Sequence, residues 1–311
     1  MSPLTVARSL LPVASGYRGR FAPSPTGPLH FGSLIAAVGS YLQARQANGA
    51  WMVRIEDLDP PRTVPGSADA ILRTLEAFGF EWDEAVVHQS QRYSFYERAL
   101  AQLRLEQRTF LCSCSRSNLA APDSGPIGRY SGTCRAKPAA PDQPLATRLR
   151  VDPGIVRFMD RIQGLITTDV TAQVGDFVLK RRDGLWAYQL AVVVDDAAQA
   201  ITEVVRGADL LDTVPRQILL QRALGLPMPE YVHLPLAMDT QGKKFSKSTG
   251  ALALNPQTPG PALWAALQFL KQSPPQDLRD CSVAQIWTWA RDHWSLLPLA
   301  GLSALPAPNS H

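Results

Sequence analysis

The 311-residue sequence has few cysteines, little net charge and no long hydrophobic run. Four cysteines are too few for a disulfide scaffold, so they indicate a reduced interior with room for a metal site. The 31 basic residues exceed the 27 acidic residues by only four, which is compatible with a nucleic-acid partner but does not argue for one. No stretch approaches the roughly 20 apolar residues of a membrane span, so we expect no membrane partner and a cytoplasmic location.

One stretch near the N-terminus combines a strand, a rigid turn and a helix. Gly19 to Phe21 can end a buried strand, the prolines and glycines that follow forbid regular structure, and apolar residues then recur at helical spacing from Phe31 to Leu42. A helix N-terminus presents free N–H groups and a partial positive charge. His30 and Gly32, placed there, suit a nucleotide phosphate and a close-lying base, so the stretch predicts a nucleotide site.

A cationic segment follows much later in the chain, at Lys243 to Ser248. Three lysines and two hydroxyl groups stand within six residues, after a turn that ends at Gly242. Such a loop could cover a polyphosphate.

Together, the two segments resemble the two signatures of the class I aminoacyl-tRNA synthetases. His30-Phe-Gly-Ser33 stands in the place of the His-Ile-Gly-His motif, and Lys244-Phe-Ser-Lys-Ser248 in the place of Lys-Met-Ser-Lys-Ser. The segments 20–27, Arg-Phe-Ala-Pro-Ser-Pro-Thr-Gly, and 54–59, Arg-Ile-Glu-Asp-Leu-Asp, narrow the resemblance to the glutamyl branch. In that branch a serine at Ser33 is usual, and Phe245 keeps the apolar character of the methionine that it replaces.

The resemblance implies a Rossmann-like α/β catalytic domain, in which a parallel sheet carries helices on both faces. A small α+β domain that contains zinc is expected to interrupt it, and a short helical C-terminal tail to follow it. The predicted boundaries are an N-terminal extension at 1–16, the catalytic domain at 17–87 and 181–248, the inserted domain at 88–180, and the helical C-terminal region at 249–311. Trp186 to Val194 is apolar enough to be the return strand of the main sheet.

Polar side chains stand at the ends of two predicted strands, where parallel-sheet enzymes bind their ligands. Glu56 follows the first of these strands, and we choose it for the α-ammonium group of an amino acid. Arg206 ends the second and could clamp a side-chain carboxylate with two hydrogen bonds. An ion pair of Arg206 with Asp209 or Glu203 is the alternative that the residues leave open. His233 is most simply a packed histidine.

The resemblance implies the remaining site residues. Arg20, Ser24 and Tyr188 would join Glu56 and Arg206 around glutamate, although an aromatic residue in the apolar run of Tyr188 is more often part of a core. ATP would be bound, together with Mg²⁺, by His30, Gly32, Lys244 and Lys247, of which His30 and Lys247 would be catalytic. Asp57 and Asp59 are at least as well explained by capping of the turn at Pro60-Pro61.

The segment from Cys112 to Cys134 contains Cys112-Ser-Cys114, a loop rich in Ser, Pro and Gly, and then Tyr130 and Cys134. Three thiolates and a fourth ligand could hold such a loop together as a tetrahedral zinc site. Tyr130 is the nearest oxygen ligand by spacing, but phenolate is an uncommon zinc ligand, so spacing leaves zinc and three reduced cysteines both open. The resemblance implies zinc, because the glutamyl-like family has a Cys-x-Cys, Tyr and Cys knuckle. We expect Cys281, far from the others, to be buried and inert.

Residues 249–311 are too few for the helical domains with which a full-length glutamyl-tRNA synthetase reads the anticodon. The combination resembles the glutamyl-queuosine tRNA(Asp) synthetase family, shortened bacterial paralogues of the glutamyl enzymes. This resemblance implies a monomer that activates L-glutamate with ATP, without tRNA, and transfers it to the queuosine base in the anticodon of tRNA(Asp). The alternatives are a minimal glutamyl-tRNA synthetase that charges the tRNA 3′ end, a nucleotidylyltransferase of the same superfamily, and a non-catalytic tRNA-binding paralogue.

Overall fold

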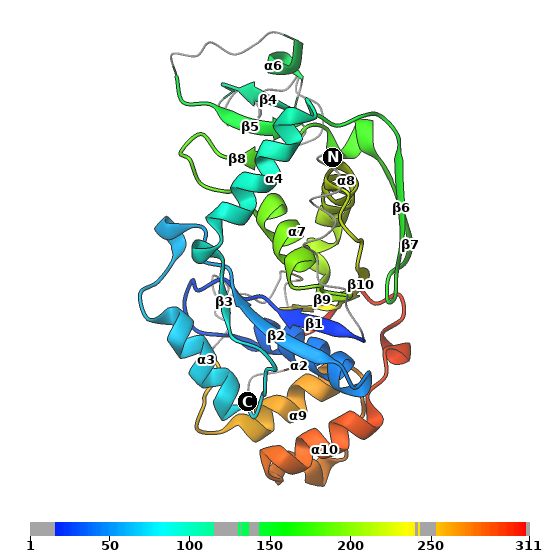
Figure 1. The fold of residues 1–311 in the computed structure, drawn as a ribbon. Coiled ribbons are helices and arrows are strands. Elements are labelled where there is room, and N and C mark those ends of the chain that lie inside the picture. The colour runs from blue at the N-terminus through cyan, green and yellow to red at the C-terminus, as the bar shows by residue number, and fades with distance from the viewer. Residues whose placement is uncertain are drawn as a thin grey trace.

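Figure 1 shows the computed structural model of the chain, which describes residues 16–114, 130, 132–136, 143–239, 242 and 253–308. Nearly all of the predicted N-terminal extension lies outside the described residues. Lys244 and Lys247 lie outside them as well. Among the described helices, none combines the length and the apolar composition needed to cross a lipid bilayer.

The centre of the molecule is a mostly parallel sheet. One part has the order β1-β2-β3 and the other the order β7-β6-β10-β9. The backbone N–H of Thr202 donates to the carbonyl of Arg18 over 2.9 Å, which joins the start of β9 to β1. The strands are β1 (Arg18–Phe21), β2 (Ala50–Ile55), β3 (Val87–His88), β6 (Ile155–Asp160), β7 (Gly164–Asp169), β9 (Glu203–Gly207) and β10 (Glu230–Leu234). Only β7 runs antiparallel to its neighbour.

Helices cover both faces of this sheet (Figure 1). One face carries α2 (Phe31–Gln46), α3 (Ser67–Ala77), α9 (Pro259–Phe269) and α10 (Val283–His293), and the other α4 (Tyr93–Leu105), α7 (Tyr188–Ala198) and α8 (Val214–Leu224). Alternate residues of β2 enter different cores, because successive side chains of a strand point to opposite faces. Trp51 and Val53 pack in the core of α2, whereas Met52 packs in the core of α7. The predicted α/β architecture with a parallel sheet is therefore confirmed.

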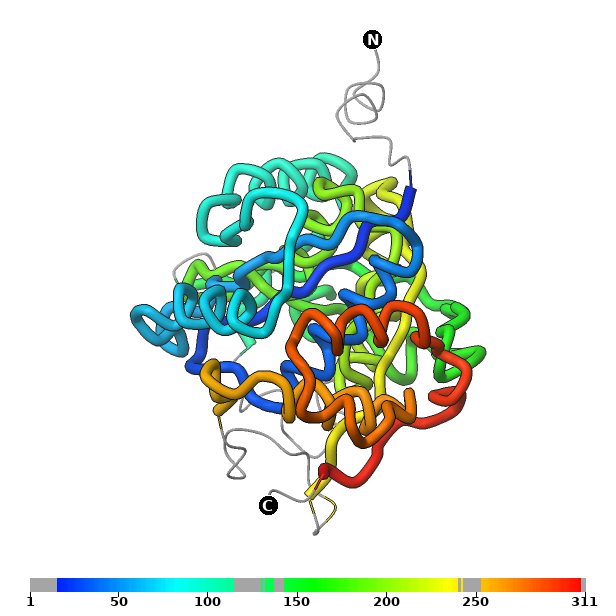
Figure 2. The backbone as a smooth tube through the Cα atoms, turned by 90° about the horizontal axis from the view of Figure 1, so that it is seen from below, coloured from blue at the N-terminus to red at the C-terminus, as the bar shows by residue number. Residues whose placement is uncertain are grey.

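Helix α2 lies very close to the sheet. A Cβ atom at Gly39 would stand 2.6 Å from Cδ1 of Leu234 in β10, so a larger residue there would push the helix away. The close contact holds the N-terminus of α2 at the ends of the central strands. In Figure 2 the C-terminal helices α9 and α10 lie across α2, and the chain then returns so that β12 (Ala304–Pro306) pairs with β11 (Leu236–Met238).

The predicted return strand at Trp186 to Val194 is wrong, because Tyr188–Ala198 forms helix α7. The run from Leu190 to Val193 is almost completely buried on all sides. A continuous apolar run of this kind suits a buried helix as well as a buried strand, and periodicity cannot separate the two.

The inserted part of the chain has a small antiparallel sheet of its own, with the order β4-β5-β8. These strands are β4 (Thr109–Cys112), β5 (Ala146–Leu149) and β8 (Val178–Lys180), and the short helix α6 (Thr133–Ala136) lies beside β4. Strands β6 and β7 fall within the predicted insertion at 88–180, yet β6 pairs with β10 of the main sheet. Part of the insertion thus extends the central sheet.

Candidate active site

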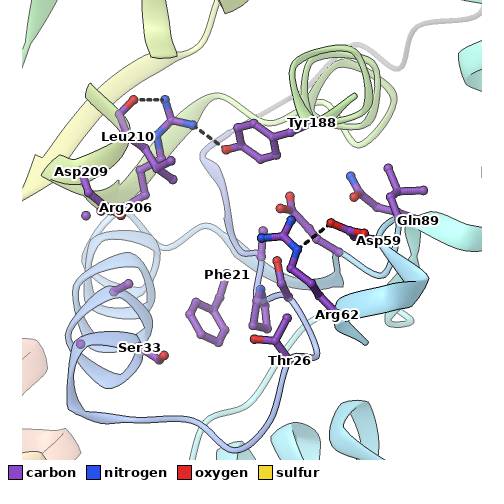
Figure 3. A pocket seen from close by; sticks show the side chains of 18 of the residues that line it. Phe21, Thr26, Ser33, Asp59, Arg62, Gln89, Tyr188, Arg206, Asp209 and Leu210 are labelled. Atoms are coloured by element: carbon purple, nitrogen blue, oxygen red, sulfur yellow. Dashed lines mark hydrogen bonds and ion pairs between the residues drawn. The ribbon is translucent and has the colours of Figure 1, made fainter. Parts of the chain in front are cut away.

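The carboxyl ends of β1, β2 and β9 and the N-terminus of α2 open into one cavity of about 1700 Å³. Sequence prediction placed ligand-binding residues on each of these elements and on α7. All those that the structure describes line the cavity, namely Arg20, Ser24, His30, Gly32, Glu56, Tyr188 and Arg206. Figure 3 shows Arg206 and Tyr188 pointing toward one another on one side of this cavity.

His30 and the first turn of α2 form the side of the cavity that suits an anion. His30 is the N-cap residue of α2, and its Nδ1 accepts a hydrogen bond of 3.3 Å from the backbone N–H of Ser33. A neutral imidazole that accepts at Nδ1 carries its proton on Nε2. The N-terminal end of the helix adds a partial positive charge, so the first turn favours a phosphate group.

Glu56 provides a largely buried carboxylate directly after β2. Its backbone N–H donates to the carbonyl of Pro23 over 2.9 Å, which ties β2 to the loop before α2. Oε1 lies 3.4 Å from Nη2 of Arg54. Burial raises the pKa of Glu56, and the nearby guanidinium groups of Arg54 and Arg20 oppose that rise. A ligand ammonium group would stabilise the ionised carboxylate further, so Glu56 suits an amino group.

Arg20 lines the cavity but has a protein partner that the sequence did not reveal. Its Nε donates to Oδ1 of Asp196 over 3.1 Å, and Nη1 of Arg54 donates to the same oxygen over 2.8 Å. Burial raises the pKa of Asp196, but Arg20 and Arg54 outweigh it and hold that pKa below the usual range. A ligand carboxylate would therefore meet an Arg20 whose charge is already partly balanced.

Arg206, in contrast, is a buried guanidinium that has no charged partner among the residues that the structure describes. Its hydrogen-bond acceptors are all neutral: Nε2 of His233 (3.1 Å), Oη of Tyr188 (3.1 Å), the carbonyl of Leu210 (3.3 Å), Oγ1 of Thr213 (3.2 Å) and Oε1 of Gln217 (3.0 Å). Figure 3 shows the bonds to Tyr188 and Leu210. In the described part of the chain, no carboxylate forms an ion pair with Arg206.

The alternative reading, an ion pair of Arg206 with Glu203 or Asp209, is therefore wrong. Glu203 instead accepts hydrogen bonds from Tyr17 and Arg161. Of the two N–H groups on Nη1 of Arg206, one has no partner among the described residues, because Tyr188 is the only acceptor there. A ligand carboxylate would therefore accept hydrogen bonds from this N–H and from the hydroxyl group of Tyr188. It would not accept from Nη1 and Nη2 of Arg206 together.

The predicted metal ligands come together between β4 and α6. The Sγ atoms of Cys112, Cys114 and Cys134 all lie within 4.8 Å of one another, and those of Cys114 and Cys134 are 3.5 Å apart. Oη of Tyr130 lies 3.6 Å from Sγ of Cys112 and 3.8 Å from Sγ of Cys114. A tetrahedron with zinc–sulfur bonds of about 2.3 Å has edges of about 3.8 Å, so the four donors fit such a centre.

Cys281 does not take part in this cluster. It is half-buried rather than buried as predicted, and its Sγ lies 3.4 Å from the carbonyl of Asp277. Asp57 and Asp59 make contacts within the protein, but the side chain of neither caps the turn at Pro60-Pro61, so the capping alternative is wrong in its detail. Asp57 accepts the backbone N–H of Ser90 over 2.8 Å, and Oδ2 of Asp59 lies 2.6 Å from Nε of Arg62.

The chain matches the family described as "tRNA synthetases class I (E and Q), catalytic domain" over residues 17–258. It is 54% identical over 301 residues to a protein of Dechloromonas aromatica (strain RCB) named glutamyl-Q tRNA(Asp) synthetase, a match that covers 94% of this chain and 99% of that protein. A protein of the same name from Ectopseudomonas mendocina (strain ymp) is 50% identical over 283 residues, with 91% and 95% covered. The chain belongs to the glutamyl-Q tRNA(Asp) synthetase family.

Solved structures of glutamate-tRNA synthetases resemble this glutamyl-Q tRNA(Asp) synthetase family member in fold. A glutamate tRNA ligase from Elizabethkingia meningosepticum in complex with its amino acid superposes with a TM-score of 0.75 and 26% identity over 93% of this chain and 67% of that one. The glutamate-tRNA synthetase from Elizabethkingia anophelis gives a TM-score of 0.77 and 27% identity, with 93% and 68% covered.

Three residues of the site were missed by reasoning from the sequence of this glutamyl-Q tRNA(Asp) synthetase family member. Asp196 supports Arg20 and Arg54, and His233 supports Arg206 together with Asp160. His233 is packed, as expected, but it also makes hydrogen bonds at both ring nitrogens. The signal for its role is the register of β9 and β10, in which His233 is the partner of Arg206.

Proposed function

We propose that this chain activates L-glutamate with ATP and transfers the glutamyl group to the queuosine base in the anticodon of tRNA(Asp). The observation that carries the proposal is the buried Arg206, whose charge has no partner in the described part of the chain and which lines the same cavity as the N-terminus of α2. An uncompensated buried guanidinium favours an anionic ligand such as a carboxylate. The helix terminus beside it favours the phosphates that activation requires.

Glutamate would lie between two groups of opposite charge. Its α-ammonium group pairs with Glu56, and its side-chain carboxylate accepts hydrogen bonds from Nη1 of Arg206 and the hydroxyl of Tyr188. Arg20 and Ser24 complete the wall beside it. This placement leaves the α-carboxylate directed at the nucleotide side of the cavity, where His30 and Gly32 stand.

In the first step an oxygen of the α-carboxylate attacks the α-phosphorus of ATP. A new bond forms between the carboxylate oxygen and the α-phosphorus. The bond from the α-phosphorus to the oxygen that bridges to the β-phosphate breaks, and pyrophosphate leaves. Positioning and charge stabilisation do most of the work in such displacements. His30 and the α2 N-terminus stabilise the phosphate charge, Lys244 and Lys247 are assigned the same role, and Mg²⁺ supplies further neutralisation when bound.

In the second step a hydroxyl on the cyclopentene ring of queuosine attacks the acyl carbon of glutamyl adenylate. An ester bond forms, the bond between the acyl carbon and the phosphate oxygen breaks, AMP leaves, and the proton of the hydroxyl is released to solvent. The groups assigned to glutamate and ATP all belong to this chain, so we expect the first step to proceed without tRNA. The assigned groups also come from one copy of the chain, in keeping with a monomer.

We assign a structural zinc ion to Cys112, Cys114, Tyr130 and Cys134. The soft sulfur donors and the near-tetrahedral spacing suit this metal. Burial raises the pKa of Tyr130, so a metal ion would be needed to hold the phenol as a phenolate. The ion would tie β4 to α6, and we assign it no part in the chemistry.

The test is transfer of labelled glutamate, with ATP and Mg²⁺, to tRNA from cells that make queuosine and to matched tRNA from cells that cannot. We expect label only on the queuosine-containing tRNA. With isolated tRNA(Asp), we expect the label to precipitate with the tRNA in acid. Label on both tRNA samples would instead identify a minimal glutamyl-tRNA synthetase that charges the 3′ end. Label on neither, with no glutamate-dependent exchange of pyrophosphate into ATP, would leave a non-catalytic tRNA-binding protein.

A further inference from the structure

A buried chain of hydrogen bonds runs from Asp160, the last residue of β6, to Arg206. Oδ2 of Asp160 lies 2.6 Å from Nδ1 of His233, and Nε2 of His233 lies 3.1 Å from Nε of Arg206. Asp160 and His233 are both almost inaccessible to solvent. Neither residue lines the cavity, so neither can touch a ligand there.

The direction of each bond in this chain is determined by Arg206. Its Nε can only donate, so Nε2 of His233 must be the acceptor and the ring proton must be on Nδ1. Nδ1 then donates to the carboxylate of Asp160. An ionised Asp160 therefore selects the one tautomer of His233 that can hold Arg206.

Asp160 is itself held in one orientation. Its Oδ1 accepts the backbone N–H groups of Ile162, over 3.0 Å, of Gln163, over 2.8 Å, and of His233 itself, over 3.3 Å. This leaves Oδ2 to face the His233 ring. The carboxylate cannot turn out of this plane without losing these backbone hydrogen bonds.

The guanidinium of Arg206 is thus fixed along two of its edges. Nη2 donates to Leu210, Thr213 and Gln217, and Nε donates to His233. Only the Nη1 edge remains for the cavity. Without the bond at Nε, the plane of the guanidinium could turn about the Nη2 contacts and carry Nη1 away from Tyr188.

We propose that Asp160 and His233 are positioning residues for the side-chain carboxylate of glutamate, because together they aim Nη1 of Arg206 at it. This inference rests on the proposed function, in which Arg206 binds that carboxylate. Asp160 and His233 then determine how well the site distinguishes glutamate from glutamine, although neither touches the substrate.

Three substitutions separate this role from simple packing. In Asp160→Asn the amide oxygen keeps the backbone N–H groups that Oδ1 accepts, so the NH₂ group must face the His233 ring. The imidazole then has to accept at Nδ1 and carry its proton on Nε2, where it opposes the donor Nε of Arg206. In His233→Asn the amide stands near the former Nδ1 and the acceptor for Arg206 is lost, whereas His233→Gln can place its amide oxygen near the former Nε2.

The experiment is glutamate-dependent exchange of pyrophosphate into ATP, with KM measured for glutamate and for ATP and with glutamine as a competing substrate. For Asp160→Asn and His233→Asn we expect KM for glutamate to rise about 10- to 100-fold, as for loss of a hydrogen bond to a charged group. The preference for glutamate over glutamine should fall with it, and KM for ATP should stay within about twofold. His233→Gln should recover most of the glutamate affinity.

A loss of folded protein would lower kcat alone and leave both KM values and the preference for glutamate unchanged. If all three variants behave in this way, the inference is overturned. So would equal effects of His233→Asn and His233→Gln. Thermal unfolding of each variant shows whether it is folded, and if Asp160→Asn is not, the two His233 variants decide. A wild-type chain without any glutamate-dependent exchange would overturn the proposed function and this inference with it.

Discussion

Replacing Asp196 with asparagine, which preserves the shape of the side chain, should destabilise the chain strongly. Asp196 is the carboxylate shared by Arg20 and Arg54, whose guanidinium groups are both almost completely buried. In Asp196→Asn the amide oxygen can keep the position of Oδ1, which accepts the hydrogen bonds from Nε of Arg20 and Nη1 of Arg54. The negative charge is lost, and the nearby carboxylates of Glu56, 3.4 Å from Arg54, and Asp195 compensate the pair only in part.

The expected loss follows from leaving buried charges without their partner. Removing one member of a buried ion pair costs about 3–5 kcal/mol. For a chain of this size, the unfolding temperature falls by about 2 °C per kcal/mol, so we expect a decrease of about 6–10 °C. The matched control is Asp183→Asn, since Asp183 pairs with Arg181 but its side chain is 48% exposed, and its loss should stay within about 1 kcal/mol.

The pH dependence gives a second check. The pKa of Asp196 is lowered in the folded chain, so its contribution to stability is fully present above the usual carboxyl pKa of 3.8 and is lost as the pH falls through the lower folded value. The difference between wild type and Asp196→Asn should therefore be constant from about pH 5 to 8 and should close only in stronger acid. Urea unfolding at several pH values measures it. A difference below about 1 kcal/mol at pH 7 would refute the role assigned to this carboxylate.

Two further predictions concern the ligands. Glu56→Gln should raise KM for glutamate about 10- to 100-fold. Because burial raises the pKa of Glu56 above 4.5, the wild-type KM for glutamate should rise as the pH falls through that higher pKa. The KM of the variant should not show this pH dependence. The purified chain should carry about one zinc ion by metal analysis; Cys134→Ser should lose it and Tyr130→Phe should release it at a lower chelator concentration, whereas Cys281→Ser should retain it. Zinc retention by Cys134→Ser, or a KM of Glu56→Gln equal to that of wild type, would contradict the respective assignment.

Local features of the chain were predictable because local sequence determines them. The turn before α2 is rich in proline and glycine, so the strand, the turn and the N-cap at His30 could be placed without knowledge of the rest of the fold. The short spacing of Cys112 and Cys114 places two sulfur atoms on one side of an extended segment, because side chains two residues apart point to the same face. Glu56 could be assigned to the cavity because it directly follows a strand that is mostly apolar.

Features that depend on which strands become neighbours could not be predicted in the same way. Asp196 follows Arg20 by 176 positions, and only the docking of α7 on the sheet makes them partners. The parallel register of β9 and β10 likewise places His233 beside Arg206, so a residue that the sequence describes as a packed histidine becomes a hydrogen-bond acceptor.

The sequence alone therefore determined the fold class, the cavity wall and the family, since these follow from motifs and from apolar runs. It did not determine that 188–198 is helical, because an apolar run without clear periodicity is compatible with both a buried helix and a buried strand. The tertiary structure also decided which charges are balanced. Asp196 compensates Arg20, whereas Arg206 has only neutral partners among the described residues, and a buried charge takes whichever partner the packing of distant elements brings within reach.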